Sequence, residues 1–69
     1  MYYIQVRKNF GVWKDFENEN PFETLEGAAK GYWYWRSRQS VGTDMRVVLR
    51  DAIFASDHEI ARHKLLGYR

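Results

Sequence analysis

The nearest approach to a metal-binding pattern in this sequence is His58, Glu59 and His63, which resemble the His-Glu-x-x-His motif of zinc proteases. The two histidines are, however, one position too far apart for that motif. Since a helix turns about 100° per residue, their spacing places them about 140° apart around a helix axis. Histidines on different faces cannot hold one zinc ion, and the chain has no cysteine to replace them. The sequence therefore predicts no metal site.

Nucleophilic catalysis has little support either. Ser37, Ser40 and Ser56 fall in predicted loops or at a predicted helix cap, and none lies in a Gly-x-Ser-x-Gly turn. The sequence contains no glycine-rich phosphate loop and no dinucleotide motif. A glycosidase-like pair of carboxylates would need a cleft that excludes water, for which 69 residues leave little room. We therefore predict a protein that is not an enzyme and has no cofactor.

Basic and aromatic residues on predicted strands form one candidate binding site. Aromatic rings can stack on bases, and arginines can neutralise phosphates. Charged side chains also serve to shield the edges of sheets, which requires no ligand. These basic and aromatic residues predict, as an alternative function, a sheet face that binds nucleic acid. Its residues are Tyr3, Arg7, Trp13, Arg46 and Arg50.

The predicted helix within residues 22–36 carries the other candidate site. Two glycines four positions apart cost this helix about 2 kcal/mol relative to alanine, so their presence calls for a reason. Small residues let another backbone approach closely, and the neighbouring aromatic residues have the composition of binding hot spots. We predict a protein-binding surface, steered by an acidic loop, that also allows a homodimer through the glycine face. Its residues are Gly27, Gly31, Trp33, Tyr34 and Trp35, with Glu17, Glu19 and Glu23 in the acidic part.

The same helix residues could instead serve only to pack the fold, and the sequence leaves this alternative open. In it, two of the aromatic residues complete the core, and the glycines lie under a neighbouring loop. The helical periodicity places Leu25, Ala28, Ala29 and Tyr32 toward the sheet, with the two glycines on the opposite side. Two starts compete for the helix: Asn20 as N-cap followed by Pro21, or Thr24 as N-cap.

Alternation of apolar and polar residues predicts the strands that position these groups. Residues 2–8 form a first strand, and residues 12–16 return beside it after the turn Asn9-Phe-Gly11, in which Gly11 can take a positive φ. Residues 45–50 form a third strand. The expected inward-facing residues are Tyr2, Ile4, Val6, Met45, Val47 and Leu49, and the expected outward-facing ones on the third strand are Arg46, Val48 and Arg50.

The C-terminal part predicts a short helix. Ser56-Asp-His-Glu59 has the form of a capping box, in which a hydroxyl and a glutamate satisfy free amides at a helix start. The helix would turn Ile60, Ala61 and Leu65 inward and end at Gly67. The apolar residues 52–55 carry no clear assignment.

These elements predict a single α+β domain over residues 1–69. A hairpin, a helix and a further strand can form a three-stranded antiparallel sheet in the order 2-1-3. The resulting ββαβ fold has one long helix on one sheet face and a short C-terminal helix. A domain of this size buries only roughly 60% of its unfolded surface, so its twelve aromatic residues are a large part of its core.

The net charge of +2 is segregated along the chain. Residues 1–14 carry three bases and no acid, whereas residues 15–35 carry five acids and a single lysine. Such segregation makes general polyanion binding less favourable than a pI of about 9.1 suggests. No leader pattern and no apolar run of about 20 residues is found, so we predict a cytoplasmic protein without membrane contact.

Residues 22–33, Phe-Glu-Thr-Leu-Glu-Gly-Ala-Ala-Lys-Gly-Tyr-Trp, and residues 45–50, Met-Arg-Val-Val-Leu-Arg, resemble a plan found in small bacteriophage host-takeover proteins. In that plan a short hairpin, an acidic helix start, an aromatic helix end and a basic strand follow one another. Over about residues 12–50 the chain is similar to the phage inhibitors of host RNA polymerase. The resemblance implies a host-takeover or anti-defence protein that binds a host protein or complex and inhibits or modulates it in the host cytoplasm.

A second likeness is to three-stranded DNA-binding domains whose helix begins Phe-x-Thr-x-acid-x-Ala-Ala. Those domains place three strands before the helix, whereas two are predicted here. This departure weakens the nucleic-acid alternative relative to protein binding.

Overall fold

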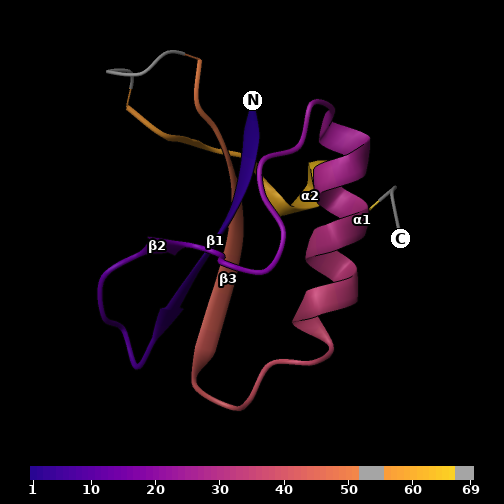
Figure 1. The fold of residues 1–69 in the computed structure, drawn as a ribbon. Helices are drawn as coiled ribbons and strands as arrows, with labels where there is room; N and C mark the ends of the chain where they lie inside the picture. The colour runs from indigo at the N-terminus through magenta and orange to yellow at the C-terminus, as the bar shows by residue number, and fades with distance from the viewer. Residues whose placement is uncertain (52–55, 67–69) are drawn as a thin grey trace.

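The fold is an antiparallel sheet packed against one long helix (Figure 1). The computed structural model describes residues 1–51 and 56–66. Its elements are β1 (Tyr2–Lys8), β2 (Lys14–Asp15), α1 (Leu25–Arg36), β3 (Thr43–Leu49), β4 (His58–Glu59) and α2 (Arg62–Leu65). The predicted α+β class, antiparallel sheet and pair of helices, one long and one short, are confirmed. The prediction of three strands is wrong, since the sheet has four in the order β2-β1-β3-β4.

The alternation of apolar and polar residues predicts the two central strands, β1 and β3, better than the edge strands. β1 and β3 pair antiparallel along their whole length, from Tyr2 opposite Leu49 to Lys8 opposite Thr43. β2 joins β1 by a much shorter ladder, in which Gln5 lies opposite Asp15 and Val6 opposite Lys14. The predicted order 2-1-3 is therefore present, and β4 extends it at the far edge of β3.

The turn between β1 and β2 uses left-handed backbone at two residues that are not glycine. Asn9 has φ 51° and Phe10 has φ 60°, and the Gly11 amide donates to the Lys8 carbonyl oxygen at 2.9 Å. Positive φ at both central residues makes this a type I′ turn, whose twist matches that of the flanking strands. Gly11 does not take the positive φ open to a glycine, because the turn is centred one residue earlier.

Helix α1 begins after Thr24, and the competing start at Asn20 is wrong. The Thr24 hydroxyl accepts a hydrogen bond from the Gly27 amide at 3.1 Å, as an N-cap does. The Asn20 side chain is engaged elsewhere: its oxygen accepts from the Ile4 amide, and its nitrogen donates to the carbonyl oxygens of Ile4 and Phe16. Asn20 thus joins β1 to the segment after β2 instead of capping the helix.

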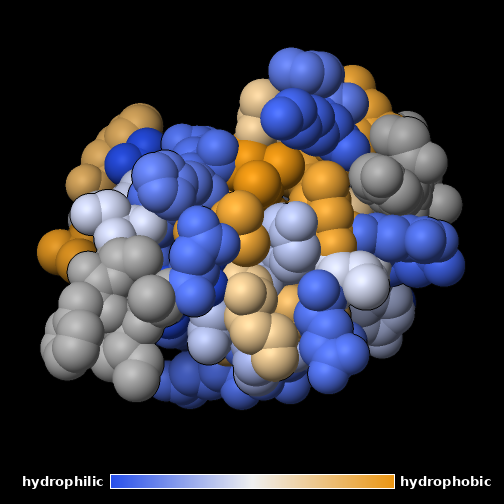
Figure 2. All heavy atoms as spheres, turned by 90° about the horizontal axis from the view of Figure 1, so that it is seen from above, coloured by the Kyte–Doolittle hydropathy of each residue, from blue (hydrophilic) through white to orange (hydrophobic). Residues whose placement is uncertain are grey.

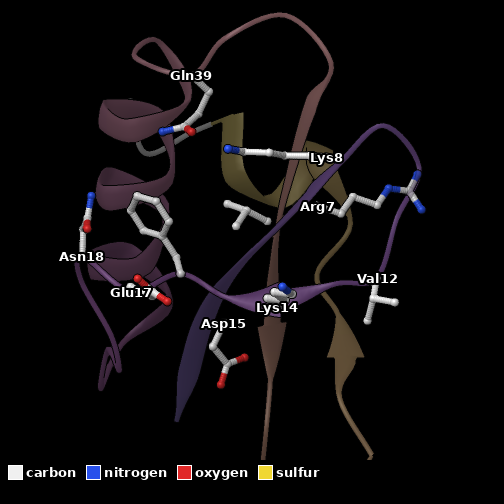
Figure 3. A pocket seen from close by; sticks show the side chains of 10 residues that line it. Arg7, Lys8, Val12, Lys14, Asp15, Glu17, Asn18 and Gln39 are labelled. Atoms are coloured by element: carbon white, nitrogen blue, oxygen red, sulfur yellow. The ribbon is translucent and has the colours of Figure 1, made fainter.

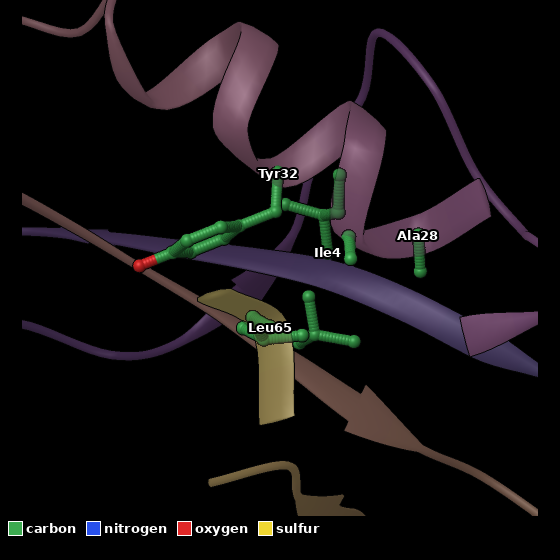
Figure 4. Close-up of a cluster of buried hydrophobic side chains, with 6 residues drawn as sticks. Ile4, Ala28, Tyr32 and Leu65 are labelled. Atoms are coloured by element: carbon green, nitrogen blue, oxygen red, sulfur yellow. The ribbon is translucent and has the colours of Figure 1, made fainter. Parts of the chain in front are cut away.

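The core lies between α1 and the two central strands. Ala28, Ala29 and Tyr32 are buried against Ile4 and Val47, which confirms the predicted inner face of the helix. Figure 4 shows Leu65, carried by α2, beneath the Tyr32 ring. Seen from the end where the N-terminus lies, hydrophobic side chains form a band across the middle of the molecule, with hydrophilic ones on both sides (Figure 2).

The segment after residue 55 departs from its prediction. The expected helix from Ser56 is wrong, because residues 58 and 59 form β4 and pair with β3, Glu59 lying opposite Val48. Residues 58 and 59 form backbone hydrogen bonds with β3 and so need no helix cap. Helix α2 starts only at Arg62. Val48, predicted to face outward, is fully buried beside β4, and Ala61, predicted inward, is exposed. Gly67 and residues 52–55 lie outside the described residues.

Candidate functional site

The predicted glycine face of α1 is occupied by the chain itself. Gly31 is buried, and a Cβ built on it would lie 2.9 Å from Cζ of Phe22 and 3.3 Å from Cδ1 of Ile4. Phe22 is held there because it exchanges two backbone hydrogen bonds of 2.8 Å with Tyr2. The prediction that Gly31 faces away from the core is wrong, and Phe22 occupies the space that a partner helix would need at Gly31; a homodimer itself stays a prediction. The open structural reading, in which a neighbouring loop covers the glycines, describes Gly31 correctly.

The aromatic residues of α1 serve mostly internal contacts. The Trp33 indole donates to the Leu65 carbonyl oxygen at 2.8 Å, and the Trp35 indole donates to Glu19 at 2.8 Å. Trp35 also packs edge-on against Phe16, with ring centroids 5.2 Å apart. Tyr34 alone among these aromatics is largely exposed, at 51%. The structure therefore does not bring the predicted protein-binding residues together into one accessible surface.

Glu17 and Glu23, the remaining residues of the acidic loop, are both exposed. Glu19 differs from them because its carboxylate accepts the Trp35 bond. The steering role predicted for this loop stays a prediction.

The predicted basic and aromatic residues do meet, on the sheet face opposite α1. We call these five side chains, Tyr3, Arg7, Trp13, Arg46 and Arg50, the outer sheet face. Trp13 lies between two guanidinium groups, with the central carbon of Arg7 4.6 Å and that of Arg46 4.3 Å from its ring centroid. Arg50 lies over Tyr3 in the same way, at 4.2 Å. Strand alternation thus predicts the membership of this face correctly.

Acidic residues neutralise the outer sheet face. Arg7 pairs with Asp44 at 2.9 Å, Arg46 with Glu59 at 3.8 Å, and Arg50 with Asp57 at 2.7 Å. Three arginines thus face three carboxylates here, and Asp15 adds a fourth by pairing with Arg50 at 3.1 Å. A phosphate-binding surface requires uncompensated positive charge, so the pairing counts against nucleic-acid binding at this face.

A buried glutamine connects these charges. Gln5 is 5% exposed, accepts from Arg46 and donates to both Asp15 and Asp57. Hydrogen bonds from Arg50 hold the pKa of Asp15 and of Asp57 below the usual 3.8, and the two carboxylates raise the pKa of Arg50. Sequence reasoning missed Asp57 because its neighbours have the form of a helix cap.

A hollow lies on the other side of the sheet, beside β2. It has a volume of about 470 Å³ and remains open because α1 packs mainly against β1 and β3. We call it the β2 groove. Its apolar residues are Val6, Val12 and Phe16, and its polar ones are Arg7, Lys8, Lys14, Asp15, Glu17, Asn18 and Gln39. Figure 3 shows Lys8 extending toward Gln39 across it, whereas Arg7 points away.

Three exposed apolar side chains lie close to this groove. Phe10 is 86% exposed, Val12 is 78% exposed, and Val41 is fully exposed. The Asn9 amide donates to the Gly42 carbonyl oxygen at 2.9 Å, which holds the β1–β2 turn against the loop before β3. Phe10 and Val41 therefore belong to the same end of the molecule. We call Phe10, Val12 and Val41 the hairpin end.

Sequence reasoning missed the hairpin end, although a signal for it exists. The second central position of a type I′ turn strongly favours glycine, and here it holds phenylalanine. A bulky residue with positive φ is a conformational outlier. The Phe10 side chain gains little burial at this position, and the Arg7 guanidinium lies 5.6 Å from its ring centroid.

Comparison with protein-family models, curated proteins and solved structures finds no match to this chain. The resemblance to phage host-takeover proteins therefore stays a prediction. Within residues 1–51 and 56–66, no cluster of three or more histidine or acidic side chains is arranged to hold a metal ion. Over the same ranges, no helix has the length and hydropathy needed to cross a bilayer.

Proposed function

We propose that this chain is a small, non-enzymatic domain that binds another protein through its hairpin end. In line with its resemblance to phage host-takeover proteins, the partner would be a host protein or complex that the domain inhibits or modulates. The observation that carries the proposal is the exposed Phe10 at φ 60°. Left-handed backbone costs a residue with a side chain about 1–2 kcal/mol, and strain of this kind persists mainly at functional sites.

The chemistry of the hairpin end fits a protein partner. Phe10 and its two valine neighbours are apolar, and aromatic anchors of this kind dominate the energetics of protein interfaces. The β2 groove begins beside them, because Val12 belongs to both surfaces. Exposed apolar side chains next to a hollow offer a partner both an anchor point and a cavity to fill.

The nucleic-acid alternative has less support than protein binding. Its residues gather on the outer sheet face, but each of its three arginines has a carboxylate partner there. The hairpin end in turn is apolar, since none of its three side chains carries a charge. Protein binding is therefore the function that we put to the test.

The variant Phe10→Gly tests the proposal because it separates folding from binding. It creates the Asn-Gly sequence that a type I′ turn prefers, so the free energy of unfolding should rise by about 1 kcal/mol. Proteins captured from a lysate of the native cell by the tagged wild-type domain should be lost with this variant. Against a purified partner, the affinity should fall by about 30-fold or more, as expected for an interface hot spot.

Tyr34→Ala is the matched control. Tyr34 is also an exposed aromatic residue, but it lies on α1, away from the hairpin end. We expect this variant to keep the partners of the wild-type domain. If Tyr34→Ala loses them and Phe10→Gly keeps them, the binding surface lies on the helix and the proposal is overturned.

A further inference from the structure

Strand β2 has a free edge. It lies at the end of the strand order, and within the described residues no strand pairs with it on the side away from β1. The Phe16 amide donates to the Ile4 carbonyl oxygen, so Phe16 directs its backbone groups toward β1. Because antiparallel strands alternate between bonded and non-bonded positions, Asp15 directs its amide and carbonyl groups outward. Another extended segment can therefore hydrogen-bond to this edge.

The β2 groove lies over the sheet face beside this edge, between β2, β1 and Gln39. Lys14, on β2, and Phe16, just after it, line the groove, as do Val6 and Lys8 on β1. Within residues 1–51 and 56–66 neither lysine forms an ion pair, in contrast to the three arginines of the outer sheet face. A strand added to β2 would direct alternate side chains toward this groove, next to two lysines that form no ion pair among the described residues.

A second copy of the chain is a poor occupant of this edge. Antiparallel self-pairing centred on β2 places either Lys14 opposite Lys14 or Asp15 opposite Asp15. Like charges directly opposite one another destabilise a strand pair. The edge thus discourages self-association and any basic segment, and it accepts an acidic one.

We propose that an acidic, extended segment of a partner protein adds to the free edge of β2 as a further strand. Its groove-facing side chains alternate with solvent-facing ones: a carboxylate lies opposite Lys14 and within reach of Lys8, and an apolar side chain lies opposite Phe16. Backbone hydrogen bonds to Asp15 contribute affinity, and the groove selects the side chains. This inference rests on the proposed function, since it names the class of segment that the protein partner supplies.

A designed peptide tests the inference without a known partner. The probe is acetyl-Ser-Val-Thr-Glu-Thr-Glu-Ser-amide, whose antiparallel addition to β2 places its valine opposite Phe16 and its first glutamate opposite Lys14. It is added to the isotope-labelled full chain and followed by the amide resonances. We expect saturable shifts centred on residues 12–17 and slower hydrogen exchange of the Asp15 amide. Two control peptides complete the set: one with lysine in place of glutamate, and one N-methylated at the residues that would bond to Asp15. Neither control should bind.

The double variant Lys8→Gln with Lys14→Gln should weaken probe binding by about tenfold, as the loss of two exposed ion pairs predicts. The inference is overturned if the probe leaves residues 12–17 unshifted, if the N-methylated peptide binds equally well, or if the double variant binds with unchanged affinity. Its failure is distinct from failure of the proposed function. Phe10→Gly reports on the hairpin end whether or not the probe adds to β2.

Discussion

The ring of Phe22 lies directly against Gly31, so close that a Cβ on the glycine would be 2.9 Å from Cζ of the ring. The contact joins the strand-like segment before α1 to the middle of the helix. It also explains why a helix that loses stability from glycine keeps one at this position. Gly27 is less constrained: a Cβ there would lie 3.7 Å from the same ring, and its nearest neighbour would be the Thr24 hydroxyl oxygen at 3.2 Å.

Replacing this glycine should therefore destabilise the fold. We expect Gly31→Leu to lower the free energy of unfolding by about 3 kcal/mol, at the upper end of overpacking costs. Urea unfolding followed by circular dichroism measures the change. Gly27→Ala is the control and should be neutral or stabilising by up to about 1 kcal/mol, because alanine favours helix. Adding Phe22→Leu to Gly31→Ala should cost less than the sum of the two single changes; strict additivity would mean that the contact does not exist.

The side chain of Asn20 should contribute as much as a core residue. It accepts from the Ile4 amide at 2.8 Å and donates to the Phe16 carbonyl oxygen at 2.7 Å. We expect Asn20→Ala to cost about 3 kcal/mol, since it leaves partly buried backbone groups without partners. Chemical denaturation provides the measurement. A loss as small as that of an exposed control, Asn18→Ala, would contradict the bridging role.

The stability of the domain should depend on pH through Asp15 and Asp57. Hydrogen bonds from Arg50 lower both pKa values in the folded state relative to the ordinary 3.8. The unfolded chain therefore binds protons first on acidification, so the stabilisation is complete above about pH 5 and is lost as the pH falls below 3.8 and through the folded pKa values. We expect a loss of about 1 kcal/mol from this pair, because solvent screens the partly exposed groups.

Arg50→Gln is the variant that checks this pH dependence. It removes the cause of both depressed pKa values, so the free energy of unfolding should fall at neutral pH and change less between pH 5 and pH 3 than in the wild type. Urea titrations at several pH values give the comparison. An unchanged acid dependence in Arg50→Gln would assign the effect to other carboxylates.

Nucleic-acid binding at the outer sheet face should be weak. Since carboxylates neutralise its arginines, we expect no saturable change in fluorescence anisotropy when a labelled single-stranded oligonucleotide is titrated at low salt. Affinity that falls steeply with salt and drops in the double variant Arg46→Ala with Arg50→Ala would instead support the nucleic-acid alternative.

Patterns within single elements predict much of this fold. Alternation predicts β1 and β3, and helical periodicity predicts that Ala28 and Tyr32 face the sheet. Strand alternation also predicts that Arg7, Trp13 and Arg46 share a face. These predictions succeed because the period of a strand or a helix determines which side chains share a face, whatever the partner elements are.

Contacts between distant parts of the chain account for the rest. Phe22 covers Gly31, Asn20 joins β1 to the segment after β2, and residues 58 and 59 pair with β3 in place of forming a helix. Each outcome depends on a hydrogen bond or a packing contact whose partner no local pattern reveals. Tertiary structure also leaves β2 at a free edge and Phe10 exposed, because α1 packs mainly over β1 and β3 and reaches the return strand through the contact of Trp35 with Phe16.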